Sequence, residues 1–337
     1  MSPSELITTL ATLVAAVIVT NLCIRAIHPL LVRYALARPN ARSSHKVPTP
    51  QGAGIAVIAT ALVIAGAAIA WQSGLTPQLW VLIGATVVIA GVGAVDDLRP
   101  LPVIPRFGMQ ALCIFVILLA LPEDLQIVPT LPLWCERAIL LLAALWFVNL
   151  TNFMDGLDWI TVAEVVPITA ALAMMGITAT LSLSTALLAA ALCGAMIGFA
   201  PFNRPVAKMF LGDVGSLPIG LLLAWCFLQL ALAGHLTAAI LLPLYYLADA
   251  TVTLLRRLAR REPFWLAHRS HFYQRATDNG FAVITVVANV FVLNIGLATL
   301  AGLSLYLNSA SADVILLAVG GASVTLLLRR FATPLAR

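Results

Sequence analysis

The amino-acid sequence predicts an all-α, polytopic membrane protein with about eleven transmembrane helices. Its 337 residues are 61% hydrophobic and only 10% charged, whereas globular domains carry roughly 25% charged residues. The mean hydropathy is +1.02, and the apolar runs are continuous, as in membrane helices, instead of alternating, as in barrel strands. Basic residues gather at alternate connections. We therefore expect one integral-membrane domain over residues 1–337, without internal repeats or a separate soluble domain.

Polar breaks and breaks rich in proline or glycine divide the chain into its expected spans. The eleven spans cover residues 6–27, 52–71, 79–95, 107–121, 138–150, 161–176, 183–200, 214–233, 236–255, 281–306 and 312–328. The sixth is the weakest, since it is short and carries Glu164 and Pro167. No basic region precedes the first span, so we expect it to be a retained helix and not a signal peptide. The five cysteines are scattered without paired spacing, which indicates neither disulfides nor a zinc site.

The orientation follows from the basic residues. Of nineteen Lys and Arg residues, all except Arg137 lie near the ends of spans one, three, seven, nine and eleven that point the same way. Because basic residues accumulate at cytosolic span ends, this places the N-terminus outside and the C-terminus in the cytosol. The net charge of +5 thus has a topological origin, and we expect no nucleic-acid partner. It also creates a field that attracts anionic lipids or phosphates at the bilayer.

Two carboxylates stand between long apolar runs in the segment from Asn152 to Asp158. Charge is costly in such a position, so a retained charge indicates a function. Asp155 and Asp158 are three residues apart and share one helical face if the sixth span begins here. A pair of helix N-caps is the structural alternative, although one helix does not need two.

A second acidic pair, Asp96 and Asp97, ends the third span. Adjacent carboxylates repel each other and also meet the negative end of the helix dipole, so a cation should compensate them. The alternative is a solvated cap that pairs with Arg99 or Arg106. With the expected topology, this pair lies on the same membrane face as Asp155 and Asp158.

The third acidic segment, Gly212 to Ser216, opens the eighth span. Free backbone N–H groups at a helix N-terminus can receive a phosphate, and Asp213 can hold a metal ion that bridges to it. A plain glycine–aspartate turn at a helix start is the alternative. Together, the three clusters predict a Mg²⁺ site for diphosphate chemistry at the cytosolic face, with Mn²⁺ as a second candidate, because Mg²⁺ prefers carboxylate oxygens and shares its shell with substrate phosphates. Four basic residues are available nearby, namely Lys46, Arg106, Lys208 and Arg269.

Two imidazoles flank Arg269 in the loop that follows the ninth span. His268 and His271 can donate to a diphosphate and meet the charge that develops on a leaving phosphate. A zinc pair without further ligands or an interfacial histidine pair are the alternatives. Asp249, inside the ninth span, is expected to be a buried structural residue that pairs with a neighbouring helix.

At these residues the sequence resembles the polyprenyl-phosphate N-acetylhexosamine-1-phosphate transferases of glycosyltransferase family 4, over almost the whole chain. This family includes bacterial enzymes that initiate O-antigen synthesis, the phospho-MurNAc-pentapeptide translocase and dolichyl-phosphate enzymes. The matching motifs are Arg42 to Pro50 with Gly52 and Gly54, Asp96-Asp97, Asn152 to Asp158, Asn203 with Phe210 to Ser216, and His268 to Gln274.

The resemblance implies transfer of a sugar 1-phosphate from a UDP-N-acetylhexosamine to undecaprenyl phosphate, with release of UMP, in the bacterial inner membrane. It implies that Asp213 and Asp97 bind the metal, and it assigns catalytic roles to Asp96, Asp97, Asp155, Asp158, His268 and His271. It assigns substrate contacts to Lys46, Thr49, Asn152, Asn203, Lys208, Phe210 and Arg269. The product would be the first lipid-linked sugar of O-antigen or a related surface glycan, and a homodimer is one oligomeric state left open.

Three positions depart from the family pattern. Trp159 replaces a glycine that many members have, Ala53 interrupts a glycine run, and Arg99 lies near a lysine of the peptidoglycan branch. The first two leave the sugar open, with UDP-GlcNAc and the deoxy sugars UDP-FucNAc and UDP-QuiNAc as candidates. The histidine loop lacks three consecutive histidines, which favours the O-antigen-initiating branch over the pentapeptide translocase. A secondary transporter or scaffold is the rival from another class, but transport sites lie near the bilayer midplane.

Overall fold

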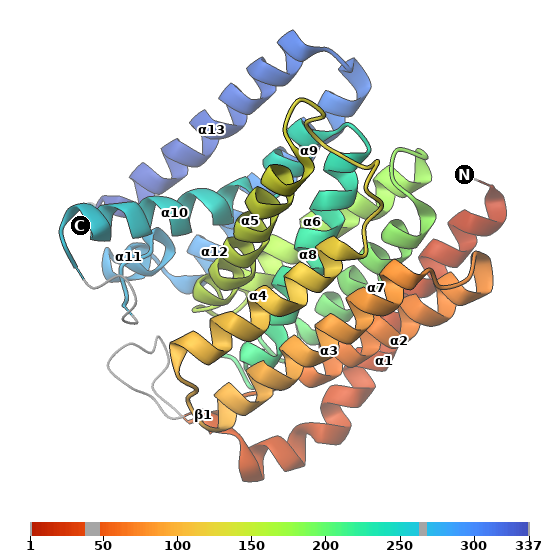
Figure 1. The fold of residues 1–337 in the computed structure, drawn as a ribbon. Helices are drawn as coiled ribbons and strands as arrows, with labels where there is room; N and C mark the ends of the chain where they lie inside the picture. The colour runs from red at the N-terminus through yellow and green to blue at the C-terminus, as the bar shows by residue number, and fades with distance from the viewer. Residues whose placement is uncertain (1, 38–47, 263–267, 336–337) are drawn as a thin grey trace.

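The computed structural model describes residues 2–37, 48–262 and 268–335 and confirms an all-α protein (Figure 1). Two short strands, β1 (Leu36–Ala37) and β2 (Thr49–Pro50), pair antiparallel. The helices are α1 (Pro3–Tyr34), α2 (Gly54–Gln72), α3 (Pro77–Leu98), α4 (Val103–Leu119), α5 (Leu133–Met154), α6 (Ile160–Ile177), α7 (Leu183–Phe199), α8 (Asp213–Leu232), α9 (Leu236–Leu241), α10 (Leu244–Ala259), α11 (Phe272–Asp278), α12 (Val283–Leu307) and α13 (Ala310–Ala332).

Eight of these helices are long and apolar enough to cross a membrane, and α4 and α7 are shorter apolar helices of 17 residues each. Each of the eleven expected spans therefore contains helix, and the protein is a multi-pass membrane protein. One expectation is wrong in detail, because the ninth span is not continuous. It breaks into α9 and α10 at Leu242 and Pro243, since a proline inside a helix lacks the N–H for the helical bond and clashes with the preceding turn.

The sixth span carries a carboxyl and a proline, yet α6 forms a complete helix because its polar group faces another helix. Glu164 is 1% exposed and accepts a hydrogen bond of 2.6 Å from Asn294 of α12. The same Asn294 amide donates to the Ala163 carbonyl oxygen at 3.1 Å. These hydrogen bonds offset part of the cost of burying polar groups, and they join α6 to α12 inside the bundle.

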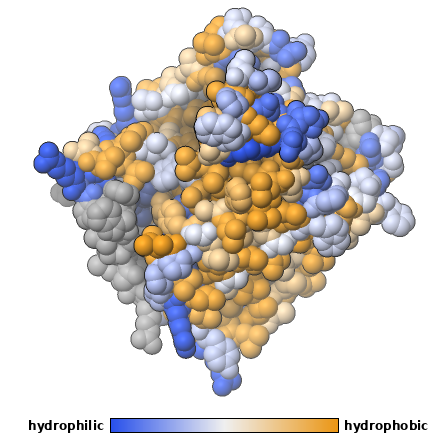
Figure 2. Space-filling view, in the orientation of Figure 1, coloured by the Kyte–Doolittle hydropathy of each residue, from blue (hydrophilic) through white to orange (hydrophobic). Residues whose placement is uncertain are grey.

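The helices bring widely separated segments of the chain to one end of the bundle. We call this the basic end; it comprises the C-terminal ends of α3, α5, α10 and α13 and the N-terminal ends of α4, α6, α8 and α12. Their association is direct, since α3 and α5 both pack along α8, and α11 packs against α13. Figure 2 shows a broad hydrophobic surface over the helices of the visible face, with hydrophilic residues toward its margins, as expected for a surface that contacts lipid.

Candidate active site at the basic end

Asp97 supplies the N-terminal cap of α8. Its Oδ1 accepts a hydrogen bond from the backbone N–H of Asp213 at 2.9 Å, and its Oδ2 accepts one from Val214 at 3.0 Å. Gly212, the residue that precedes α8, has a φ of +76° and no side chain to cap the helix. The end of α3 thus provides the carboxylate that the free N–H groups and the positive dipole of α8 require.

Glycines allow this approach between helices. A Cβ on Gly54 would collide with the backbone of Gly215 in α8, and a Cβ on Gly93 would collide with the backbone of Asp213. Any larger residue at either position would push α2 or α3 away from the start of α8. The close packing therefore sets the position of Asp213 relative to Asp97.

Asp96 and Asp213 meet at one cation. Arg106 Nη1 lies 2.6 Å from Asp96 Oδ2 and 3.6 Å from Asp213 Oδ2. Asp96 Oδ1 also accepts the backbone N–H of Leu101 at 2.6 Å. The pairing of Asp96 with Arg106, the structural alternative considered from the sequence, is therefore present, and the arginine extends it to the carboxylate on α8.

Asn152 brings α5 into the same cluster. Its side-chain amide donates to Asp213 Oδ1 at 2.8 Å and to Ser216 Oγ at 2.9 Å. Three carboxylates from α3 and α8, an amide from α5 and a guanidinium from α4 thus converge at the basic end.

Asp155 and Asp158 lie in the turn that joins α5 to α6. Asp155 Oδ1 accepts a hydrogen bond from Thr161, and Asp158 Oδ2 accepts one from the backbone N–H of Ala207 at 3.0 Å. Burial, together with the negative charges of Asp97 and Asp158, raises the pKa of Asp155 to about 6, against the lowering effect of the Thr161 hydrogen bond. Positive charge entering this site would favour the ionised carboxylate.

The connection between α7 and α8 carries two of the expected substrate-binding residues. Asn203 is 7% exposed; its Oδ1 accepts the backbone N–H of Trp159 at 2.7 Å, and its Nδ2 donates to the Met209 carbonyl oxygen at 3.0 Å. Asn203 therefore fastens this connection to the start of α6. Phe210 forms an isolated parallel bridge with Gln51, whose side chain donates to the Asp97 carbonyl oxygen at 2.7 Å.

The other expected substrate residues have different environments. Thr49 is buried in β2, and Lys208 is exposed in the α7–α8 connection. Lys46 lies outside the described residues.

The histidine loop is organised by Asp249 of α10. This carboxylate is fully buried; Oδ1 accepts the backbone N–H of Phe272 at 2.9 Å, and Oδ2 accepts that of Tyr273 at 3.1 Å. His271 Nδ1 lies 3.3 Å from Asp249 Oδ1, and the rings of His268 and His271 are 4.9 Å apart. Asp249 thus caps α11 and orients His271, as its expected role as a buried structural residue requires.

Arg269 is held by the same short helix, at 3.1 Å from Thr277 Oγ1 and 3.2 Å from Asp278 Oδ1. Tyr273 connects this loop to the acidic turn, since its hydroxyl donates to the Phe153 carbonyl oxygen at 3.0 Å. A Cβ on Gly156 would collide with that hydroxyl. The glycine between Asp155 and Asp158 therefore permits the contact between the acidic turn and α11.

Sequence reasoning did not assign site roles to Gln51 and Tyr273, and it did not foresee that Asp249 orients His271. A signal existed for Asp249, because an acid within an apolar run must find a partner. Gln51 and Tyr273 carry no comparable signal, since their contacts join segments far apart in the chain.

The donor chemistry of the site fits Mg²⁺. Within residues 2–37, 48–262 and 268–335, no three His, Cys, Asp or Glu side chains are close enough to enclose a metal ion by themselves. Mg²⁺ does not need such a cage, because it commonly takes one or two carboxylates and completes its shell with water and substrate phosphates. Asp213 is the best-placed carboxylate, and each oxygen of Asp97 keeps a second lone pair beyond its backbone hydrogen bond.

Known proteins are similar to the part of the chain that carries these residues. The model of glycosyl transferase family 4 matches residues 79–231, which include Asp96, Asp97, the Asn152 to Asp158 segment and Asp213. A probable undecaprenyl-phosphate N-acetylglucosaminyl 1-phosphate transferase of Bacillus subtilis is 27% identical over 319 residues, 88% of this chain and 87% of the relative.

Two further relatives match shorter stretches. A decaprenyl-phosphate N-acetylglucosaminephosphotransferase of Mycobacterium tuberculosis is 31% identical over 56% of this chain, and this chain spans about half of that relative (52%). A phospho-N-acetylmuramoyl-pentapeptide-transferase of Lactiplantibacillus plantarum is 29% identical over 62% of this chain and 72% of the relative.

The apolar helices show an integral-membrane protein, and the similarity to polyprenyl-phosphate sugar phosphotransferases shows that it is an enzyme. Because the family match covers the acidic residues that build the cluster, its class can be stated more closely. Over residues 79–231 the chain is similar to glycosyl transferase family 4.

Proposed function

We propose that the protein transfers a sugar 1-phosphate from a UDP-N-acetylhexosamine to undecaprenyl phosphate and releases UMP. The observation that carries this proposal is the convergence of Asp96, Asp97 and Asp213 with Arg106 at the N-terminus of α8. Such a site combines carboxylates for a divalent cation with N–H groups and a cation for phosphate oxygens. The relatives of Bacillus subtilis and Mycobacterium tuberculosis, both named as polyprenyl-phosphate N-acetylglucosamine-phosphate transferases, support it.

In the proposed reaction, an oxygen of the lipid phosphate attacks the phosphorus that bears the sugar. The new P–O bond forms as the bond from that phosphorus to the bridging oxygen breaks, and UMP leaves with the bridging oxygen. Bound Mg²⁺, or Mn²⁺, would neutralise the diphosphate charge and help to align the two phosphates. Asp213, with Asp97, would hold the metal, and Asp96 keeps Arg106 beside it.

The remaining residues position the substrates in this proposal. Asp155 and Asp158 order the turn that lines the donor site, and Asn203 and Phe210 place the α7–α8 connection against it. His268, Arg269 and His271 supply donors for the diphosphate or the sugar, on a loop oriented by Asp249. Lys46, Thr49, Asn152 and Lys208 complete the proposed substrate contacts.

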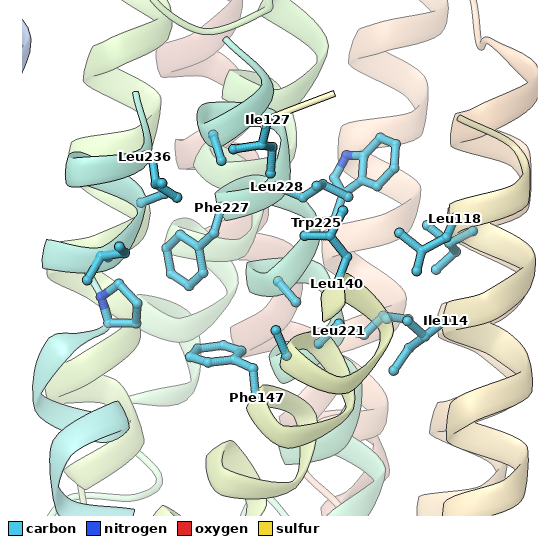
Figure 3. A pocket seen from close by; sticks show the side chains of 18 of the residues that line it. Ile114, Leu118, Ile127, Leu140, Phe147, Leu221, Trp225, Phe227, Leu228 and Leu236 are labelled. Atoms are coloured by element: carbon cyan, nitrogen blue, oxygen red, sulfur yellow. The ribbon is translucent and has the colours of Figure 1, made fainter. Parts of the chain in front are cut away.

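An apolar cavity supports a lipid acceptor. A cavity of about 210 Å³ lies between α4, α5, α8 and α9, and Figure 3 shows Ile114, Leu140, Phe147, Trp225 and Leu228 around it. Phe147 lies five residues before Asn152 on α5, which is about 7.5 Å along the helix. A phosphate bound beside Asn152 could therefore continue into an isoprenoid tail that packs in this cavity.

We further propose that the basic end faces the cytosol of a bacterium, with the protein in the inner membrane, and that the product starts O-antigen or a related surface glycan. The asymmetry of the basic residues supports the orientation. The donor would be UDP-GlcNAc or a deoxy derivative such as UDP-FucNAc or UDP-QuiNAc. A homodimer is compatible with this proposal.

The test is a panel of UDP-sugars, including UDP-MurNAc-pentapeptide, incubated with purified protein and undecaprenyl phosphate. We expect mass analysis to detect a lipid-diphosphate sugar from a UDP-N-acetylhexosamine. A product from UDP-MurNAc-pentapeptide alone would favour the alternative, which the Lactiplantibacillus relative supports. No lipid-linked product from any donor would contradict the proposed reaction.

Metal removal provides a separate test. Treatment with a chelator should stop UMP release, and added Mg²⁺ or Mn²⁺ should restore it, because the clustered carboxylates need a divalent cation to accept a diphosphate. Ca²⁺ serves as a control for general charge screening, since it prefers more ligands at longer distances. Undiminished turnover after exhaustive chelation would contradict the magnesium assignment.

A further inference from the structure

A second charged region of the basic end lies where the C-terminal part of α10, the short α11 and the C-terminal part of α13 meet. Figure 1 shows α10 running out from the bundle toward this junction. α10 and α11 each pack against α13 there. The region is built from other residues than the acidic cluster, and the proposed function assigns no role to its arginines.

Two arginines share one aromatic ring at this junction. The guanidinium carbon of Arg256, on α10, lies 5.0 Å from the centroid of the Phe272 ring, and that of Arg275, on α11, lies 5.6 Å from it. Phe272 is 5% exposed, so it is a fixed platform. Contact with an aromatic ring orders a guanidinium, and two like charges are thereby held near each other.

The nearby carboxylates have other partners. Glu262 pairs with Arg257 at 2.9 Å, and Asp278 pairs with Arg269 at 3.2 Å. Asp249 accepts the backbone N–H groups that begin α11. Among the described residues, neither Arg256 nor Arg275 forms an ion pair, although Arg275 donates to the Ala332 carbonyl oxygen at 3.5 Å. Arg329 and Arg330 add positive charge at the end of α13.

An apolar face adjoins these charges. Val252, Leu255 and Leu258 on α10 are 38%, 56% and 54% exposed, and their spacing of three residues puts them along one side of the helix. An exposed apolar strip that ends at ordered guanidiniums matches a ligand with acyl chains and an anionic headgroup. A free phosphate would use the charges but leave the strip uncovered.

We propose that Arg256 and Arg275, ordered by Phe272, bind the headgroup phosphate of an anionic phospholipid whose acyl chains lie along Val252, Leu255 and Leu258. Basic pockets between membrane helices are suited to such headgroups. Bound lipid would offset the repulsion between the two arginines and hold α11 in place. Since α11 also follows His271, the site adjoins the histidine loop without belonging to it.

The test uses the full-length protein in mixed micelles, with lipid binding followed by native mass spectrometry. Three probes are compared: phosphatidylglycerol, phosphatidylcholine and soluble glycerol 3-phosphate. Wild-type protein should retain phosphatidylglycerol over the other two. The variant Arg256→Gln/Arg275→Gln should bind it about tenfold or more weakly, as expected when two basic contacts near a lipid surface are lost.

A matched control separates a site from general attraction. Arg25→Gln/Arg204→Gln removes the same charge from exposed positions of α1 and of the α7–α8 connection and should change retention less than about twofold. Equal weakening in both variants, or retention of glycerol 3-phosphate as strong as that of the lipid, would overturn the proposal. If Arg256→Gln/Arg275→Gln misfolds, Phe272→Leu replaces it, because leucine keeps the apolar packing but removes the ring; unchanged selectivity in that variant would equally overturn the proposal.

Discussion

Asp213→Asn should reduce UMP release by about 10²–10³-fold or more, the cost of losing one central electrostatic contact in a transition state. Asn152 and Arg106 both contact the Asp213 carboxylate, at the start of the helix where the diphosphate is proposed to bind. Asparagine keeps the size of the side chain but removes the charge that a divalent cation requires. The measurement is UMP release by detergent-purified protein.

The fold should tolerate this substitution, because the backbone N–H of residue 213, and not its side chain, donates the hydrogen bond to the capping carboxylate of Asp97. Asp124→Asn is the matched control, since it removes one carboxylate from the exposed loop at the other end of the bundle. Its turnover should equal that of the wild type. Wild-type turnover in Asp213→Asn would contradict the metal role proposed for this residue.

Asp97→Asn should impair both stability and activity. Each Asp97 oxygen accepts one backbone N–H of α8, whereas an asparagine has a single acceptor oxygen and would direct its NH₂ group at the second donor. A partly buried donor left without a partner costs about 1–3 kcal/mol. We expect a lower melting temperature than for Asp213→Asn, together with a loss of UMP release.

This pair of variants separates two roles for Asp97. If Asp97 only binds the metal ion, both variants should melt at the wild-type temperature and should differ from the wild type in turnover alone. If it also caps α8, only Asp97→Asn should lose thermal stability, and restoring the metal should not recover it. Equal melting temperatures for Asp97→Asn and the wild type would show that the cap contributes little to folding.

The helices themselves were predictable because membrane insertion depends on local composition. Each expected span contains helix, since a run of apolar residues must satisfy its own backbone hydrogen bonds in lipid. Helix ends were less predictable. α5 begins at Leu133, five residues before the expected start at 138. The additional turn contains Glu136, whose charged side chain accepts the backbone N–H groups of Ile127 and Val128. The helix break at Pro243 follows from the missing backbone N–H of proline. The apolar pattern of the ninth span continues across this residue, so hydropathy alone did not indicate the break.

The acidic motifs were also visible in the sequence, since Asp96, Asp97, Asp155, Asp158 and Asp213 stand out against their apolar surroundings. What each carboxylate contacts was not visible. The choice between a cap and a ligand for Asp97 depends on α8, which begins 116 residues later. The close packing at Gly54 and Gly93 helps to bring these segments together.

The sequence by itself determined where the apolar helices lie, the alternation of their basic ends and the identity of the charged residues, because these depend on composition and order along the chain. The tertiary structure alone decided that Asp97 caps α8, that Arg106 joins Asp96 to Asp213, and that Asp249 orients His271. The physical reason is that hydrogen bonds and ion pairs act over about 3 Å, so their partners are set by how glycine-lined helices pack and not by distance along the chain.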